Sequence, residues 1–248
     1  MNIQPPEKPS TSVDGSLKVH SIFKTIQGEG PFTGQRAIFV RLWGCNLQCP
    51  LCDTEYTSHG GLMAPNELVK AVEHAATPNL PDWAASEMAT ALRVEINMGY
   101  LVVITGGEPF RQNLRPAIEA LLEDGFGVQL ETNGTLYQDL PYEDIIVVCS
   151  PKTGSINKDL VPHIQTLKYV ICSEDVSDVD GLPMSALKHP CGGRLARPPV
   201  GFQGMVLVQP ADEGDEGKNR ENLNTTVNSV MEFGYTLQLQ NHKLIGVP

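Results

Sequence analysis

The feature that most constrains the fold is a series of short apolar runs that alternate with stretches of helical periodicity. Because the runs are nearly continuous in Val, Ile and Leu, they are typical of strands buried on both faces of a parallel sheet. They occur at 37–42, 101–105, 127–131, 145–149, 167–171, 205–209 and 236–240. This alternation predicts an α/β fold with a parallel sheet.

Helices are expected between several of the runs. One begins at Pro65 and another at Leu114, and a third amphipathic stretch ends near Gly234. The apolar positions of the third are Leu223, Val227, Val230 and Met231. Residues 78–99 read as a further helix, whereas residues 173–204, rich in Pro and Gly, read as an irregular insertion.

One domain with its own core suits a chain of 248 residues. Residues 1–17 hold prolines, serines and scattered charge without periodicity, so we expect a flexible N-terminal tail. Residues 18–248 are expected to form a single domain that includes the insertion.

Charge and hydropathy exclude several classes of protein. The chain has 18 basic and 29 acidic residues and a net charge of −11. It has no cluster of Lys and Arg that would bind nucleic acid or an anionic membrane. No apolar run is long enough to span a bilayer, and the N-terminus lacks the layout of a secretory signal. We therefore expect a cytoplasmic protein, in which cysteines serve metals or catalysis more often than disulfides.

Cys45, Cys49 and Cys52 form the most specific motif. They follow the run 37–42 directly, so they lie on a loop at the end of a strand. Three thiolates so close together repel one another unless a cation or cluster neutralises them. A 4Fe–4S cluster suits this spacing, and because such clusters normally take four cysteines, one iron would stay open for another ligand.

The alternative interpretation of this loop is a structural zinc site, which His59 could close into a tetrahedral shell. The other cysteines have no evident partner, and we interpret them as small buried or loop thiols. They are Cys149, Cys172 and Cys191.

Polar residues gather where successive predicted strands end. Since the carboxyl ends of parallel strands share one edge of a sheet, and ligands bind there, we predict that this edge is the active site. The segments are Thr105–Pro109 with Gly107 and Glu108, Glu131–Thr135 with Asn133, Ser150-Pro151-Lys152, and Gln209-Pro210-Ala211-Asp212.

The cysteine spacing, together with Gly106–Pro109, resembles the radical S-adenosylmethionine enzymes. In that superfamily the open iron binds the amino and carboxylate groups of S-adenosylmethionine, and the matching Gly-Gly-Glu-Pro segment holds the methionine amino group. Leu51 stands where the family commonly has an aromatic residue near the adenine. The resemblance implies an incomplete (β/α) TIM-like barrel.

Further segments resemble one branch of the superfamily, the 7-carboxy-7-deazaguanine synthases of queuosine and related deazapurine biosynthesis. The resemblance covers Val19 to Pro248 except the insertion. It rests on 23–30, Arg41, Cys52-Asp53-Thr54, 131–134, 150–152 and 240–248.

The resemblance implies a role for each site residue. Cys45, Cys49 and Cys52 would hold the cluster, and Thr54 would bind Mg²⁺. Cofactor contacts are expected at Gly107, Glu108, Glu131, Asn133, Ser150, Pro151, Lys152, Gln209, Pro210, Ala211 and Asp212. Substrate contacts are expected at Ile26, Gln27, Gly28, Arg41, Thr105 and Pro248.

Arg41 can also be argued from the residues alone. It alternates with Phe39 and Ala37 on one face of an apolar strand. A buried guanidinium there needs an anion, which could be a substrate carboxylate or an internal Asp or Glu.

The implied reaction converts 6-carboxy-5,6,7,8-tetrahydropterin to 7-carboxy-7-deazaguanine with loss of ammonia. The resemblance also implies an electron donor of flavodoxin or ferredoxin type and a homodimeric assembly. Three alternatives stay open from the sequence: a glycyl-radical activating enzyme, a zinc-stapled binding module without catalytic activity, and an electron-transfer protein.

Overall fold

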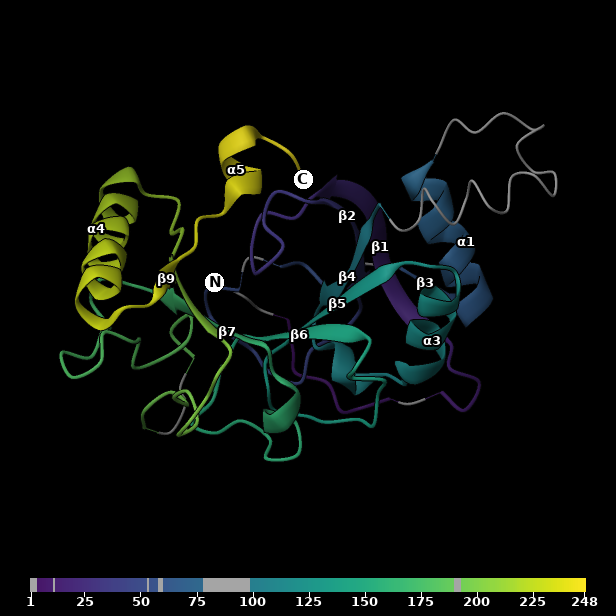
Figure 1. Ribbon diagram of the computed structural model, residues 1–248, viewed down its shortest axis with the longest axis horizontal. Helices are drawn as coiled ribbons and strands as arrows, with labels where there is room; N and C mark the ends of the chain where they lie inside the picture. Colours follow the sequence, from purple (N-terminus) through teal and green to yellow (C-terminus); the bar gives the residue numbers. More distant parts are fainter. Residues whose placement is uncertain (1–3, 11, 53, 58–59, 78–98, 190–192) are drawn as a thin grey trace.

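The computed structural model describes residues 4–10, 12–52, 54–57, 60–77, 99–189 and 193–248. These residues build one nine-stranded sheet in the order β3-β1-β2-β4-β5-β6-β7-β8-β9, with helices packed around it (Figure 1). His59, Cys191 and, apart from Gly99, the helix expected over 78–99 lie outside the described residues.

The sheet is antiparallel at one edge and parallel elsewhere. β1 is antiparallel to both β2 and β3, and every pair from β2 to β9 is parallel. Because β3 and β9 have one neighbour each in this order, the sheet stays open as an incomplete barrel. The strands are β1 (Leu17–Ile26), β2 (Arg36–Leu42), β3 (Gly61–Met63), β4 (Leu101–Gly106), β5 (Gly127–Thr132), β6 (Ile145–Cys149), β7 (Thr166–Ile171), β8 (Met205–Pro210) and β9 (Thr236–Leu237).

The apolar runs predicted the parallel strands well. Each run forms a strand whose ends differ from the prediction by one residue at most, except that β9 ends at Leu237 instead of 240. Strands β1 and β3 were not predicted. In β1, buried Leu17 and Val19 alternate with exposed or half-buried polar residues, so it has no continuous apolar run.

Two helices cover the sheet near its antiparallel edge (Figure 1). They are α1 (Pro65–Ala76), which begins at the predicted residue, and α3 (Arg115–Glu123), which begins one residue after the predicted Leu114. Leu68 and Val72 of α1 and Ile118 and Leu121 of α3 are fully buried in the main hydrophobic core. This apolar layer supports the strands whose carboxyl ends carry the polar residues.

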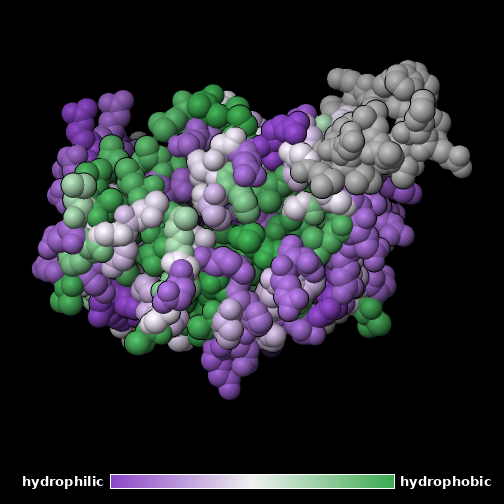
Figure 2. Space-filling view, in the orientation of Figure 1, coloured by the Kyte–Doolittle hydropathy of each residue, from purple (hydrophilic) through white to green (hydrophobic). Residues whose placement is uncertain are grey.

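Helix α4 (Glu216–Phe233) lies at the opposite end of the sheet and has an unexpected orientation (Figure 1). An amphipathic helix normally buries its apolar face. Here Asn222, Thr226 and Ser229 are buried, whereas Leu223 and Val227 are 38% exposed and Met231 is 81% exposed. Figure 2 shows apolar side chains on the surface at this end of the molecule.

Contacts between α4 and the insertion at residues 173–204 explain why polar side chains of this helix are buried. Its described residues form turns and isolated bridges without a named helix or strand, and part of its backbone hydrogen bonding is made to other segments. The Asn222 amide oxygen accepts from the Ser173 N–H at 2.7 Å, and the Ser229 hydroxyl donates to the Gly181 carbonyl at 2.7 Å. Asn222 and Ser229 therefore face inward on α4 because they bind the insertion, whereas the Thr226 hydroxyl donates to the Asn222 carbonyl of its own helix.

The first and last described segments of the chain are both held by hydrogen bonds to other segments. After β9 the chain forms α5 (Asn241–Ile245) and returns to β1, where the last residue, Pro248, is bound. At the other end, residues 4–10 contact the cysteine loop through hydrogen bonds, although the sequence led us to expect a flexible tail. Among the described residues, no helix combines the length and apolar character that crossing a membrane requires.

Candidate active site

A cleft of about 490 Å³ opens at the carboxyl ends of the parallel strands. All the predicted site residues line it except Gly28, Glu108 and Pro151. Since those residues come from seven separate segments of the chain, the parallel topology is what brings them together. The structure thus brings the predicted strand-end residues together in one cleft, while their roles stay predictions.

The cysteine loop is held against the glycine turn that follows β4. The Glu108 N–H donates to the Gly44 carbonyl at 2.9 Å, and the Gly107 N–H donates to Leu42 at 3.0 Å. A Cβ on Gly107 would lie 1.8 Å from that Gly44 oxygen, so a larger residue would push the loop away. Glycine at 107 is therefore needed for the close approach of the two segments.

The three predicted cluster ligands all face the cleft. Burial raises the pKa of the Cys45 thiol to about 12, and the charges of Glu108, Cys49 and Cys52 act in the same direction. Burial also raises the pKa of Cys49 to about 11. A positive group that enters the cleft would favour the thiolate forms of Cys45 and Cys49, which fits the chemistry of an iron–sulfur cluster bound by thiolates.

The three sulfurs do not converge on a single point in this conformation. Among the residues that the structure describes, no three His, Cys, Asp or Glu side chains form a ready-made metal cage. The Cys45 sulfur accepts from the Leu47 N–H at 3.5 Å, and the Cys52 sulfur contacts the Thr54 carbonyl at 3.7 Å.

Glu108 lies behind the cleft and not in it. Its side chain is 1% exposed, and its carboxylate accepts from the Thr132 hydroxyl and the Asn133 N–H, both at 2.7 Å. Burial raises the pKa of Glu108 to about 7 in spite of these donors. In this structure Glu108 joins the ends of β4 and β5, while its contact with a methionine amino group stays a prediction.

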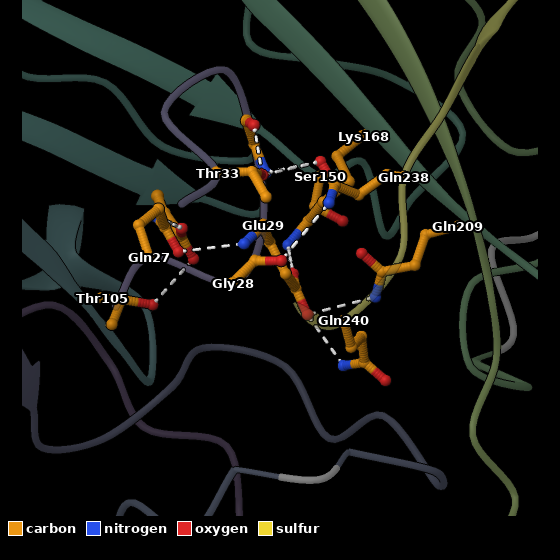
Figure 3. Close-up of polar contacts among 12 residues, drawn as sticks. Gln27, Gly28, Glu29, Thr33, Thr105, Ser150, Lys168, Gln209, Gln238 and Gln240 are labelled. Atoms are coloured by element: carbon orange, nitrogen blue, oxygen red, sulfur yellow. Dashed lines mark hydrogen bonds and ion pairs between the residues drawn. The ribbon is translucent and has the colours of Figure 1, made fainter. Parts of the chain in front are cut away.

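Glu131 collects donors from three elements at the centre of the cleft. Its carboxylate accepts from the Gln129 amide at 2.9 Å, the Thr105 hydroxyl at 3.2 Å and the Gln27 amide at 3.3 Å. Figure 3 shows Gln27 and Thr105 turned toward the same point. These donors are neutral, and no ion pair of Glu131 occurs among the described residues, so this part of the cleft favours a ligand that carries N–H donors or positive charge.

A second carboxylate, Glu29, pairs with Lys168 across the floor of the cleft (Figure 3). The Gln240 amide donates to Glu29 at 2.7 Å and the Gln209 amide at 3.2 Å. Burial alone would raise the pKa of Glu29, but the charge and hydrogen bond of Lys168, the Gln240 hydrogen bond and His242 lower it to about 2. Glu29 is therefore ionised throughout the physiological range.

Arg41 projects into the cleft from β2 with its guanidinium 4.8 Å from the centre of the Phe23 ring. Phe23 stacks in turn on Phe39 at 5.5 Å. No carboxylate within the described parts of the chain forms an ion pair with Arg41. The sequence allowed two anionic partners for Arg41, a substrate carboxylate or an internal Asp or Glu. Because the described residues supply no internal partner, a ligand carboxylate is favoured.

The C-terminal segment forms one wall of the cleft. The Thr25 hydroxyl donates to the terminal oxygen of Pro248 at 2.6 Å, and the Asn241 N–H donates to the Gly28 carbonyl at 3.1 Å. A Cβ on Gly28 would lie 2.0 Å from the His242 ring nitrogen. Gly28 therefore contributes to the site by admitting the C-terminal segment and not by lining the cleft.

Removal of the Thr25 hydroxyl should loosen this end of the chain. In Thr25→Val we expect amide exchange of the C-terminal peptide to rise about fivefold, because one partly buried hydrogen bond is lost. Hydrogen–deuterium exchange read by mass spectrometry measures it, with Thr236→Val on the exposed strand β9 as the matched control. Equal exchange in the two variants would show that the bond does not hold the terminus.

Several cleft residues were not among the predictions. No sequence signal marked Lys168, which lies inside an apolar strand, or Leu47, Tyr56 and Val170. Glu29, Gln240 and His242 lie within segments that carry the family resemblance, 23–30 and 240–248. Their position in those segments was the available signal, but their partners lie far away in the chain and no sequence pattern links them.

An open, mostly parallel sheet with a three-cysteine loop and a glycine turn at its carboxyl edge defines a radical S-adenosylmethionine enzyme. No protein-family model matches the chain. It is 39% identical over 250 residues to 7-carboxy-7-deazaguanine synthase of Rhodospirillum rubrum, covering 98% of this chain and 97% of that protein. The enzyme of the same name from Rickettsia prowazekii is 38% identical and is covered to 94%.

The chain belongs to the 7-carboxy-7-deazaguanine synthase family, as the sequence motifs predicted. It is an enzyme of deazapurine biosynthesis. In fold it is similar to the crystal structure of QueE from Escherichia coli, with a TM-score of 0.62 at 19% identity over 90% of this chain and 93% of the other. The expected radical S-adenosylmethionine fold is thereby confirmed.

Proposed function

We propose that the chain converts 6-carboxy-5,6,7,8-tetrahydropterin to 7-carboxy-7-deazaguanine and releases ammonia. The observation that carries the proposal is the cleft itself, which holds the cysteine loop together with Arg41, a cation without a carboxylate partner in the described residues. Its curated relatives are named for this product. A carboxylated substrate provides the anion that Arg41 requires.

The cysteine end of the cleft would hold the cofactors that membership of this family implies in general. Bound there, a 4Fe–4S cluster with S-adenosylmethionine supplies a 5′-deoxyadenosyl radical. This chain contributes the thiolates of Cys45, Cys49 and Cys52. The backbone around Gly107 lies next to this loop, and Lys152 and Asn133 line the same wall, where they would orient the methionine end.

The opposite end of the cleft would hold the pterin. Arg41 would bind the substrate carboxylate, and Glu131 would accept from ring N–H groups that replace its bonds to Gln27 and Thr105. Pro248, which lines the cleft, would contact the substrate as well. Thr54, which lines the cleft beside the cysteines, would supply an oxygen ligand to Mg²⁺.

The direct test is product formation under anaerobic conditions. The chain is reconstituted with iron and sulfide, reduced, and given S-adenosylmethionine, Mg²⁺ and the carboxylated pterin. We expect 7-carboxy-7-deazaguanine by mass spectrometry, with less of it when Mg²⁺ is withheld. Release of 5′-deoxyadenosine without this product would reject the proposed substrate but keep the enzyme class.

Arg41→Met distinguishes this substrate from the protein substrate of a glycyl-radical activating enzyme. Loss of a buried charge-assisted contact should lower kcat/KM for the pterin about a hundredfold, while cleavage of S-adenosylmethionine without product continues. Arg36→Met, on the same strand but outside the cleft, is the control. Wild-type kcat/KM in Arg41→Met would remove Arg41 from the substrate site.

Three further properties belong to this proposal. The reducing electron would come from a flavodoxin- or ferredoxin-type protein, and the chain would act as a homodimer. The enzyme would work in the cytoplasm, where reduced thiols are maintained.

A further inference from the structure

The N-terminal segment contacts both ends of the cysteine loop. We call residues 4–10 the N-terminal strap. The Glu7 N–H donates to the Cys45 carbonyl at 2.7 Å, at the first cysteine. The Gln4 amide donates to the Thr54 carbonyl at 3.1 Å and its oxygen accepts from the Tyr56 N–H at 2.9 Å, just beyond the last cysteine. Gln4 and Glu7 thus fix the backbone on both sides of the three cysteines.

Arg111, in the short 3-10 helix η2 (Pro109–Arg111) after the glycine turn, holds the strap in place. Its guanidinium donates to the Glu7 carbonyl at 3.0 Å, the Glu7 carboxylate at 2.8 Å and the Lys8 carbonyl at 2.7 Å. A fourth bond reaches the Trp43 carbonyl at 3.2 Å. Three of the four acceptors of this guanidinium therefore belong to the strap.

Because the Arg111 guanidinium is buried, the loss of its hydrogen bonds to the strap would be energetically costly. The Arg111 side chain is 3% exposed and Glu7 is 37% exposed, so the pair is covered mainly on the arginine side. A guanidinium without its acceptors in such a place is strongly unfavourable, because arginine cannot lose its proton. Without the strap, Arg111 would have to move or draw in water.

A movement of Arg111 would displace the backbone of the cysteine loop. A Cβ on Gly44, the residue before Cys45, would lie 2.1 Å from an Arg111 guanidinium nitrogen. Gly44 also has a φ of +82°, a conformation that glycine adopts without strain. The arginine thus packs directly against the backbone that positions the first cysteine, and its place is set by the strap.

We propose that the N-terminal strap and Arg111 are positioning elements for the cysteine loop, which hold its backbone at Cys45 and Thr54 so that the cysteines are placed for a bound cluster. The role is indirect, since neither the strap nor Arg111 lines the cleft. The proposal rests on the proposed function only in that the cysteines bind a cluster. It makes no use of the identity of the substrate.

The first test measures how firmly the reconstituted, anaerobic holoenzyme retains iron against a chelator, followed by the loss of its visible absorbance. Arg111→Met should release iron about tenfold faster than the wild type, because the strap loses its bonds to the guanidinium. Arg115→Met is the matched control, since Arg115 is exposed and pairs with Glu119 and Asp139 on the surface. Iron release at the wild-type rate in Arg111→Met, or equally fast release in the control, would overturn the proposal.

The second test needs no cluster and separates this proposal from the proposed function. In the protein before reconstitution, hydrogen exchange of the 45–56 peptide should rise about tenfold in Gln4→Ala combined with Glu7→Ala. The β5 peptide should exchange as in the wild type, which shows that the fold is intact. Unchanged exchange over 45–56 would overturn the positioning role even if the enzyme forms product, and raised exchange would support it even if the substrate is another.

Discussion

Replacement of Cys49 by alanine is expected to reduce product formation to background and to leave the reconstituted protein without a stable 4Fe–4S cluster. Cys49 is one of three thiols that line the cleft, and it comes from the middle of the loop. With only two cysteine ligands, a second iron of the cluster would lack a thiolate and be exposed to solvent. The cluster would therefore not be stable. Iron content, visible absorbance and product mass are the measurements.

Cys149→Ala is the matched control for this variant. Both thiols are buried, with Cys49 7% and Cys149 0% exposed, and burial raises the pKa of each. Cys149, however, lies at the end of β6 in the main core and does not line the cleft. Its loss should cost about 1 kcal/mol of stability by leaving a small cavity, with the cluster retained. A normal cluster in Cys49→Ala, or its loss in both variants, would contradict the assignment of the ligands.

The parallel strands and the position of the site could be predicted because local pattern and burial agree there. β4 reads Leu-Val-Val-Ile because both of its faces are covered, and the residues that follow it are polar because the strand ends at the cleft. Once the strands were taken as parallel, topology placed Thr105, Glu131 and Ser150 on one edge. The cysteine spacing then identified the chemistry of that edge.

The orientation of helix α4, the N-terminal strap and the pairing of Lys168 with Glu29 could not be predicted. They depend on contacts that no local sequence pattern encodes. Helix α4 has an apolar repeat, but Asn222 and Ser229 face inward because the insertion needs hydrogen-bond partners, and that need appears only once the insertion is placed. The N-terminal strap has no periodicity, since its backbone bonds are made to a loop and not within an element. Lys168 and Glu29 are 139 residues apart, and each alone resembles a solvated charge.

Replacement of Glu29 by glutamine should cause the largest loss of stability among single changes in the cleft. Lys168 is 10% exposed and Glu29 15% exposed, so the change leaves a buried ammonium without its partner. Breaking one side of a buried pair costs roughly 3–5 kcal/mol. The new amide would also present N–H groups to the Gln209 and Gln240 amides, which are donors themselves. Urea unfolding measures the free energy.

The double variant Glu29→Gln with Lys168→Met is the control. Removing both charges avoids the unpaired ammonium, so the free energy of unfolding should recover by about 2 kcal/mol or more relative to the single variant. The Gln240 bond to the carboxylate is still lost, and with it part of the attachment of the C-terminal segment. KM for the pterin should therefore stay raised in both variants. A double variant no more stable than the single one would show that the ion pair is not the source of the loss.

The pH dependence of the same variant provides an independent check. In the folded protein the pKa of Glu29 is lowered from 4.5 to about 2, so the folded state favours the ionised form. Its contribution is fully present above the unfolded value of 4.5 and is lost as the pH falls through the folded value of about 2. The difference in unfolding free energy between wild type and Glu29→Gln should thus be constant near neutral pH and shrink below 4.5. A difference that grows on acidification would mean that Glu29 is protonated in the fold, which would contradict its pairing with Lys168.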